Sequence, residues 1–225
     1  MNEFDSPEKF MEACGYVVGD LWYPRVTKIV EIKAKPALYR FYGRMASFAE
    51  GERVKNRSAS EGTAIHEAAE AILLGKEPTI PSSIAPSLVA FREFLATRRI
   101  VVHPEFVEHR LANHDERYAG TLDAIADIDE KIGVLDLKTS LEIYRDYNLQ
   151  TAAYFAAMQN IVPRLETRWI LRIDQQKMCA RCGAGLREKG GRSKVRTAYQ
   201  SGNGKSEAHC GVSHEDHYWG PTKGI

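Results

Sequence analysis

The chain has 225 residues, of which 44% are hydrophobic and 27% charged, with a formal net charge of +1 at pH 7. This composition is ordinary for a globular protein with one substantial core, and the charge argues neither for nor against nucleic acid. No apolar run approaches the roughly 18 residues of a membrane span, and the polar start MNEFDSPEKF is unlike a signal peptide. Four cysteines without a disulfide-framework pattern favour a reducing cytoplasm, including the host cytoplasm for a viral protein.

Apolar spacing predicts helices over residues 5–18, 36–51, 61–74 and 87–98. Pro36 suits the start of the second helix. Ser60 is expected to cap the third, which carries His66 and stops at Gly75. From its spacing alone, His66 is a histidine packed in a helix, and Glu70, one turn further on, is interpreted as solvent-facing.

Two predicted strands, 118–128 and 134–138, form a hairpin around a tight turn at residues 129–133, and residues 105–111 form a further strand before it. Asp136 and Lys138 share a face of the second strand because side chains at i and i+2 point the same way. Hairpin pairing brings Asp123 beside them. Two carboxylates and an ammonium would mispair in an apolar core, but they suit a divalent metal with a water and a phosphate.

Beyond the hairpin, Asp146 is expected to cap a helix over residues 147–159, where Gln150 and Tyr154 are stacked on one face. On this pattern alone Tyr154 is a core tyrosine. Residues 166–174 form another strand. The resulting order predicts an α/β (α+β) domain over residues 1–176, built as a mixed central β-sheet flanked by helices.

Four motifs stand in order along this domain: Gly62-Thr63-Ala64-Ile65-His66, Gly120-Thr121-Leu122-Asp123, Asp136-Leu137-Lys138-Thr139, and Gln150 with Tyr154. In this order and spacing they resemble the PD-(D/E)XK nucleases, in particular the RecB-like exonuclease branch with its phage and mitochondrial genome-maintenance members. The resemblance covers about residues 20 to 175 and implies a restriction-endonuclease-like core. Arg25 stands where an upstream P-S-V-T segment of the family carries serine.

The resemblance implies a metal-dependent DNA nuclease, with an exonuclease favoured. Lys138 would orient the attacking water and stabilise the transition state, and Gln150 and Tyr154 would position the DNA strand. The implied ligands of the catalytic Mg²⁺ or Mn²⁺ are Asp123, Asp136, the carbonyl of Leu137, His66 and Glu108.

The expected partner is single- or double-stranded DNA, with recombination or helicase proteins as further partners in DNA repair or recombination. A different class stays open, namely a non-catalytic nucleic-acid-binding protein that grips DNA or RNA with its C-terminal tail. That tail, residues 177–225, is basic: positions 177–205 hold eight Lys or Arg and a single acidic residue, Glu188. Such charge would add phosphate contacts without sequence information.

The tail also carries a metal-binding pattern, in which a Cys-x2-Cys pair (Cys179, Cys182) and a Cys-x3-His pair (Cys210, His214) are separated by 27 residues. This spacing predicts a structural Zn²⁺ in a ribbon-like appendage, with His209 and His217 as substitutes for His214. The alternative is a 4Fe-4S cluster on Cys14, Cys179, Cys182 and Cys210, a cysteine distribution that some RecB-like nucleases have. The long gap after Cys182 and the surplus histidines favour zinc.

Overall fold

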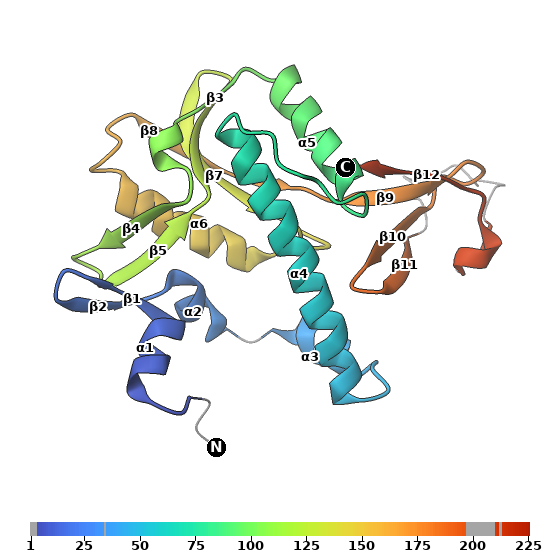
Figure 1. Cartoon of the computed structure of the whole chain (residues 1–225), viewed down its shortest axis with the longest axis horizontal. Coiled ribbons are helices and arrows are strands. Elements are labelled where there is room, and N and C mark those ends of the chain that lie inside the picture. The colour runs from blue at the N-terminus through green and yellow to red at the C-terminus, as the bar shows by residue number, and fades with distance from the viewer. Residues whose placement is uncertain (1–3, 34, 197–209, 212) are drawn as a thin grey trace, which may run out of the picture.

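The computed structural model describes residues 4–33, 35–196, 210–211 and 213–225, and the fold is of the mixed α+β class (Figure 1). The helices are α1 (Pro7–Cys14), α2 (Val26–Glu31), α3 (Pro36–Tyr42), α4 (Phe48–Leu73), α5 (Ala85–Thr97) and α6 (Arg145–Met158), with short 3₁₀ helices η1 (Pro104–Phe106) and η2 (His214–Asp216). The strands are β1 (Gly15–Val18), β2 (Leu21–Pro24), β3 (Ile100–Val102), β4 (His109–Asn113), β5 (Tyr118–Leu122), β6 (Ala124–Ile128), β7 (Lys131–Lys138), β8 (Leu165–Arg172), β9 (Gln175–Cys179), β10 (Gly185–Lys189), β11 (Arg192–Arg196) and β12 (Trp219–Gly224). No helix in these ranges is long and apolar enough to cross a bilayer.

The central sheet has the order β3-β6-β7-β8, with β8 parallel to β7 and the other neighbours antiparallel. The predicted hairpin is therefore present as β6 and β7. Its turn is shorter than predicted, because only Asp129 and Glu130 separate the two strands, and both have positive φ values (51° and 71°). Two such residues give the turn a twist that matches the paired strands.

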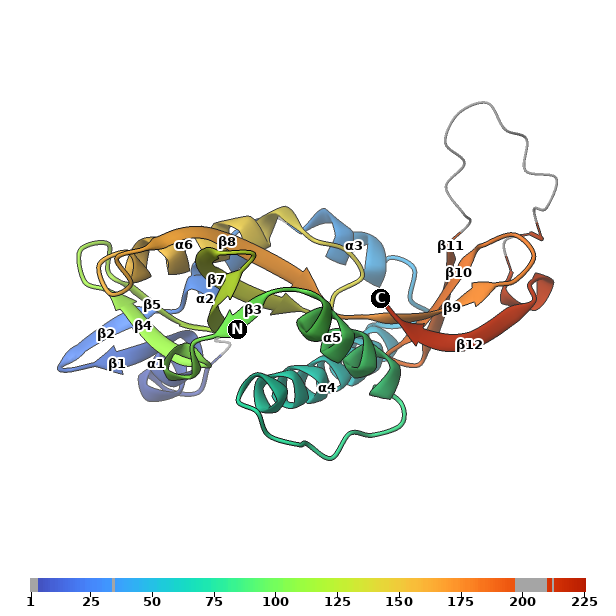
Figure 2. The same ribbon diagram turned by 90° about the horizontal axis from the view of Figure 1, so that it is seen from above.

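Helices cover both faces of this sheet, as Figure 2 shows, with α6 on one side and α4 and α5 on the other. Successive side chains of β7 point to opposite faces of the sheet, so they pack against different helices. Leu135 and Leu137 pack in the cluster of α4 and α5, whereas Val134 packs in the cluster that includes Met158 of α6. Burying apolar surface in both layers stabilises the sheet, at roughly 25 cal/mol per Å² removed from water.

Helix α4 corrects the predicted helix boundaries, because it is one long helix from Phe48 to Leu73. Its N-cap is Ser47, whose hydroxyl accepts a hydrogen bond from the Glu50 amide. Ser60 is no cap: it lies inside the helix, and its hydroxyl donates to the carbonyl of Asn56. No proline interrupts residues 48–73, so the glycines and polar residues there do not end the helix.

Three further local predictions were wrong in detail. The predicted strand 118–128 is divided at Asp123, and Leu122 and Ala124 consequently pack in opposite clusters. The predicted strand 105–111 is a 3₁₀ helix followed by β4, with Glu108 at a φ of 49° between them. Helix α6 begins at Arg145 with Tyr144 as its N-cap, and Asp146 instead forms an ion pair with Lys33 at 3.2 Å.

The C-terminal segment forms a second four-stranded sheet of order β11-β10-β9-β12, called here the C-terminal sheet. It extends away from the end of β8 in both views (Figures 1 and 2). Backbone hydrogen bonds in both directions between Asp174 and Ile225 fasten its root, and β12 packs against α5. Cys179, Ala184 and Leu186 are buried. The predicted boundary at residues 176 and 177 falls inside β9.

Candidate functional site

The centre of the site is the carboxyl end of β7, where Asp136 and Lys138 share a face as their spacing predicts. The Asp136 side chain is fully buried, and the Lys138 ammonium lies 2.6 Å from its carboxylate. Both oxygens of the Asp136 carboxylate lie close to the Lys138 ammonium, because Oδ1 accepts its hydrogen bond and Oδ2 lies 2.6 Å from the same Nζ. A fully buried carboxylate is energetically costly unless a cation balances its charge, and Lys138 is the cation that the protein itself supplies.

Asp123 reaches the same place from the bend between β5 and β6. Its Oδ2 accepts a hydrogen bond of 2.5 Å from the backbone amide of Leu137, and its own carbonyl accepts one of 3.0 Å from the amide of Glu108. The bend therefore turns the Asp123 carboxylate toward the segment that carries Asp136 and Lys138. The Leu137 side chain points the other way, into the core.

The electrostatics of these carboxyl groups reflect their mutual proximity. Burial raises the pKa of Asp136 to about 7; Lys138 opposes that rise and the charge of Asp123 adds to it. Removal from water likewise raises the pKa of Glu108 to about 7, with contributions from Asp123 and then Glu70. Acidic groups held this close favour either protonation or a bound cation.

His66 approaches from α4. Burial lowers the pKa of His66, Asp123 acts in the opposite direction, and Lys138 lowers it further. The histidine is therefore within electrostatic reach of two of the predicted site residues. Glu70, one turn along α4, is half-buried rather than solvent-facing, and its charge acts on Glu108. Glu70 follows His66 by four residues, and this helical spacing was the sequence feature that could have indicated its place near the site.

Two motif glycines allow close packing around the site. A Cβ atom at Gly62 would lie 2.8 Å from Oγ1 of Thr139, and a Cβ at Gly120 would lie 2.5 Å from Cε1 of Tyr154. Thus α4 can press against the end of β7, and β5 against α6, only where the side chain is a hydrogen. The sequence motifs include both glycines, but their role as contact points appears only in three dimensions.

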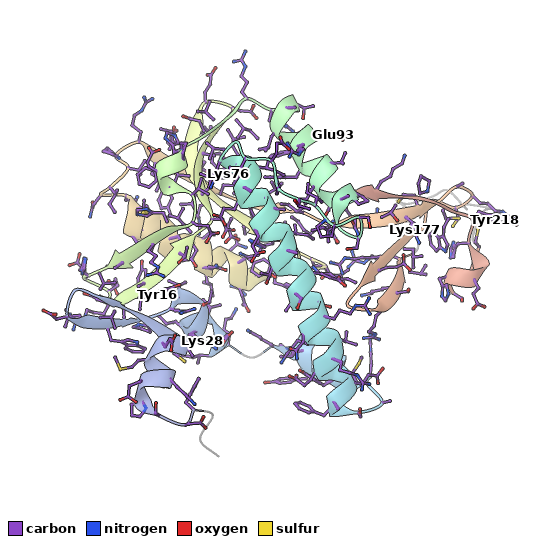
Figure 3. The ribbon with its side chains drawn as sticks, viewed as in Figure 1. Tyr16, Lys28, Lys76, Glu93, Lys177 and Tyr218 are labelled. Atoms are coloured by element: carbon purple, nitrogen blue, oxygen red, sulfur yellow. The ribbon has the colours of Figure 1, made fainter. Side chains whose placement is uncertain are left out.

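Gln150 and Tyr154 interact as their spacing predicts: the Gln150 amide donates to the Tyr154 hydroxyl at 3.0 Å. Tyr154 is only 3% exposed and belongs to the core, so Gln150 is the member of the pair that solvent reaches. Next to it, the Tyr16 hydroxyl lies 3.1 Å from Oγ1 of Thr121. Figure 3 shows Tyr16 on β1, beside β4 and β5. No sequence pattern had indicated Tyr16.

A separate group of potential metal ligands lies in the C-terminal sheet. The ligand atoms of Cys179, Cys182, Cys210 and His217 are all within 4.8 Å of one another, and no other group in the described part of the chain meets this criterion. The Sγ atoms of Cys179 and Cys210 are 3.9 Å apart, and Cys182 Sγ lies 3.3 Å from Nδ1 of His217. Three thiols and an imidazole are a donor set typical of Zn²⁺.

The geometry of His217 supports this assignment. Its Nε2 lies 3.1 Å from the carbonyl of Gly211, which can only accept, so Nε2 carries the proton and Nδ1 is left to face the thiols. A hydrogen bond of this kind on the far nitrogen is the usual support of a metal-binding histidine. Burial, followed by hydrogen bonds with the thiols of Cys182 and Cys179, raises the pKa of Cys210 to about 11.

The fourth ligand therefore differs from the prediction, because His217 takes the place assigned to His214. His214 begins the 3₁₀ helix η2, its side chain is exposed, and its carbonyl accepts a hydrogen bond from Trp219. Cys14, required for the iron–sulfur alternative, is buried at the end of α1, on the opposite side of the molecule from the C-terminal sheet in both views (Figures 1 and 2). His209 lies outside the described residues.

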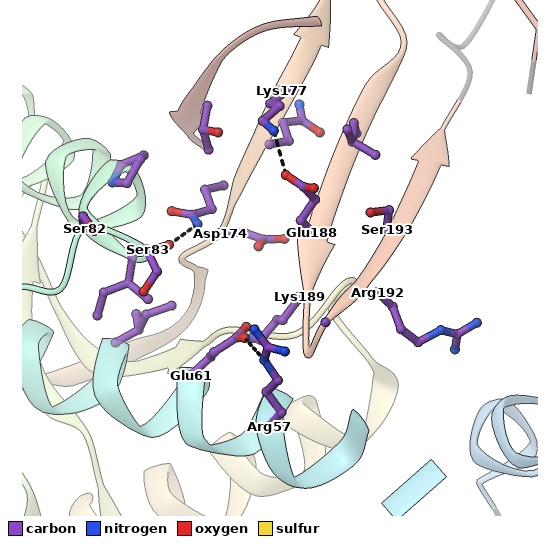
Figure 4. A pocket seen from close by; sticks show the side chains of 18 residues that line it. Arg57, Glu61, Ser82, Ser83, Asp174, Lys177, Glu188, Lys189, Arg192 and Ser193 are labelled. Atoms are coloured by element: carbon purple, nitrogen blue, oxygen red, sulfur yellow. Dashed lines mark hydrogen bonds and ion pairs between the residues drawn. The ribbon is translucent and has the colours of Figure 1, made fainter. Parts of the chain in front are cut away.

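A cavity of about 450 Å³ is lined by residues of both α4 and the C-terminal sheet (Figure 4). Its charged side chains are of both signs and largely pair with each other. Arg57 lies 3.6 Å from Glu61, and Lys177 lies 2.8 Å from Glu188. Lys189 and Arg192 also line this cavity, and neither forms an ion pair among the described residues.

No protein-family model matches this chain, and no curated protein matches it. The functional argument consequently rests on the residues and geometry described above.

Proposed function

We propose that the chain is a divalent-metal-dependent nuclease of the PD-(D/E)XK type that hydrolyses phosphodiester bonds in DNA, and that it acts as an exonuclease of the RecB-like branch. The observation that carries the proposal is the meeting of Asp123, Asp136 and Lys138 at the end of β7. Asp123 accepts a hydrogen bond from the Leu137 amide, and Asp136 and Lys138 form a buried ion pair. A mixed sheet with helices on both faces is the core that this type of nuclease uses, which supports the same conclusion.

The residues at this place fit a hard divalent cation. The donors are mainly carboxylate oxygens, and burial together with the charge of Asp123 raises the pKa of Asp136, an effect that a bound cation would counter. The residues that would hold Mg²⁺ or Mn²⁺ are Asp123, Asp136, Glu108, His66 and the carbonyl of Leu137. When bound, such an ion lowers the pKa of a coordinated water and polarises the scissile phosphate.

Protein groups supply the remaining chemistry. Lys138, which now neutralises Asp136, orients the attacking water and stabilises the added negative charge of the transition state. Gln150 contacts the DNA backbone from α6. Tyr154 acts through packing, since its ring fills the space above Gly120 and its hydroxyl holds the Gln150 amide.

In the C-terminal sheet, the cluster of Cys179, Cys182, Cys210 and His217 is proposed to bind a structural Zn²⁺. Cys179 is the last residue of β9, Cys182 lies in the turn between β9 and β10, and the other two ligands lie before β12. One ion would therefore tie three strands together, which would stabilise a sheet with a small core.

The test is cleavage of end-labelled linear and circular DNA, single- and double-stranded, with and without Mg²⁺ or Mn²⁺. We expect metal-dependent release of nucleotides from linear substrates. Asp136→Asn should lower the rate at least about a hundredfold, the scale at which loss of a positioned electrostatic group lowers kcat. Asp127→Asn, which removes a carboxylate from β6 away from the bend, is the matched control. DNA binding without cleavage under all these conditions would instead identify a non-catalytic nucleic-acid-binding protein.

A further inference from the structure

A second cavity, of about 370 Å³, opens directly beside the proposed catalytic residues. It shares His66 and Lys138 with the catalytic site. No carboxylate lines it, in contrast with the larger cavity described above. Its lining side chains otherwise carry positive charge, hydroxyl groups or small apolar groups: Ser58, Ala59, Thr139, Ser140, Leu141, Tyr147, Arg187 and Lys189.

Two of these cations come from β10, in the C-terminal sheet. Arg187 and Lys189 both donate to the same neutral acceptor, the carbonyl of Thr139, just after Lys138. Among the described residues Lys189 forms no ion pair, although an ammonium carries three donors. Burial, followed by the charge of Arg187, lowers the pKa of Lys189 to about 8.

The charges of the nearby carboxylates act on Lys189, but both groups form their ion pairs with other cations. Asp174 pairs with both Arg172 and Arg187 at 2.5 Å. Glu61 pairs with Arg57 and accepts a hydrogen bond of 3.1 Å from the Gly190 amide. Lys189 therefore brings to the cavity a positive charge that no ion pair compensates, whereas Arg187 shares the single carboxylate of Asp174 with Arg172.

We propose that this cavity binds a phosphate of the nucleic-acid strand next to the phosphate that is cleaved, with Lys189 and Arg187 as its main protein ligands. The inference rests on the proposed nuclease function, which it deepens by assigning a second substrate contact. Charge-assisted donors converging with hydroxyls suit an acceptor with several oxygens, as a phosphate is. A volume of about 370 Å³ also leaves room for the attached sugar.

The C-terminal sheet is then a wall of the substrate site rather than a separate DNA-gripping tail. The turn after β10 is docked on α4, where the Gly190 amide bonds Glu61 and a Cβ at Gly190 would collide with Ser58. The positive φ of Gly190 (63°) also favours glycine there. This docking fixes Lys189 against Thr139.

The experiment compares Lys189→Gln with Lys194→Gln. Lys194 is an exposed residue paired across the same hairpin with Arg187, so both variants lose one charge from one sheet. Binding of a fluorescent single-stranded oligonucleotide is measured by anisotropy in buffer without Mg²⁺ or Mn²⁺. We expect Kd to rise about tenfold for Lys189→Gln, to change less than about twofold for Lys194→Gln, and to stay near the wild-type value for Lys189→Arg. Inorganic phosphate should displace the oligonucleotide from wild type.

A second measurement uses wild-type protein and decides the matter even if Lys189→Gln does not fold. Acylation of lysines, read by mass spectrometry, should be suppressed at Lys189 but not at Lys194 when inorganic phosphate or oligonucleotide is added. Equal acylation of Lys189 with and without phosphate, or equal Kd values for the two glutamine variants, would overturn the phosphate site while leaving metal-dependent cleavage intact. Protection of Lys189 in a protein that cleaves no DNA would overturn the nuclease and keep the phosphate site.

Discussion

Gly120 of β5 lies directly beneath the ring of Tyr154 on α6, so close that a Cβ atom would be 2.5 Å from Cε1. This contact links the strand that leads to Asp123 with the helix that carries Gln150. Because Tyr154 is buried on all sides, its ring cannot move aside without disturbing Val134 and Met158 in the same cluster. The distance between the bend at Asp123 and α6 is therefore set by the absence of a side chain at Gly120.

Gly120→Ala is accordingly expected to destabilise the protein by roughly 1–3 kcal/mol, the usual range for overpacking a core. It should also lower DNA cleavage, since the shift moves Asp123 relative to Gln150. Thermal unfolding and a cleavage assay measure the two effects. Gly220→Ala is the control, because its Cβ would meet only the Met178 carbonyl at an ordinary 3.4 Å. Equal melting temperatures for the two variants would contradict the packing argument.

The raised pKa of Asp136 predicts a pH dependence of stability. In the folded chain this carboxyl keeps its proton until about pH 7, whereas the ordinary pKa of the free group is 3.8. The folded state therefore binds more protons than the unfolded state between about pH 4 and pH 7. The contribution to the free energy of unfolding is present at low pH and is lost as pH rises through this window.

Measured in buffer without divalent metal, the Tm of Asp136→Asn should consequently fall less than that of wild type between pH 5 and pH 8. The comparison between the two proteins removes the effects of other titrating groups, His66 among them. Added Mg²⁺ should raise the wild-type Tm most at pH 8, where the ionised carboxylates bind it. Parallel pH curves for the two proteins would show that Asp136 ionises normally.

The position of His217 gives a prediction about zinc that distinguishes two neighbouring histidines. His217→Ala should lose most of its bound zinc, because Nδ1 faces the three thiols, whereas His214→Ala should keep about one zinc per chain. Elemental analysis of the purified proteins provides the measurement. Iron with acid-labile sulfide, lost on Cys14→Ser, would instead support the iron–sulfur alternative.

Sequence patterns predicted the parts of the site that depend on local geometry. The shared face of Asp136 and Lys138 follows from strand alternation, and the approach of Asp123 follows from the hairpin. The Cys-x2-Cys pair is local in the same sense. Each of these needs only a few neighbouring residues and one standard element.

What the sequence did not predict depends on contacts between distant segments. The sequence pattern that predicts a single strand continues through Asp123 without a break, but the strand bends there. The bend arises because β5 and β6 belong to different sheets. The choice of His217 over His214 depends on how η2 turns the chain. Lys189 comes 51 positions after Lys138, and only the docking of β10 on α4 brings it to the site.

The pair formed by Lys138 and Asp136 supports a last prediction, in which one substitution separates stability from catalysis. At pH 8, where Asp136 is ionised, Lys138→Ala removes the cation that neutralises a fully buried carboxylate, and breaking such a pair typically costs about 3–5 kcal/mol. The variant should therefore be clearly less stable than wild type without metal. Mg²⁺ should stabilise it more than wild type, because the ion replaces the missing positive charge.

Cleavage should still fall at least about a hundredfold, since a transition-state contact is lost while DNA binding remains. Melting temperatures with and without Mg²⁺, oligonucleotide affinity and cleavage rates test these three expectations, with Lys194→Ala as control. Undiminished cleavage by Lys138→Ala would exclude the catalytic role of Lys138.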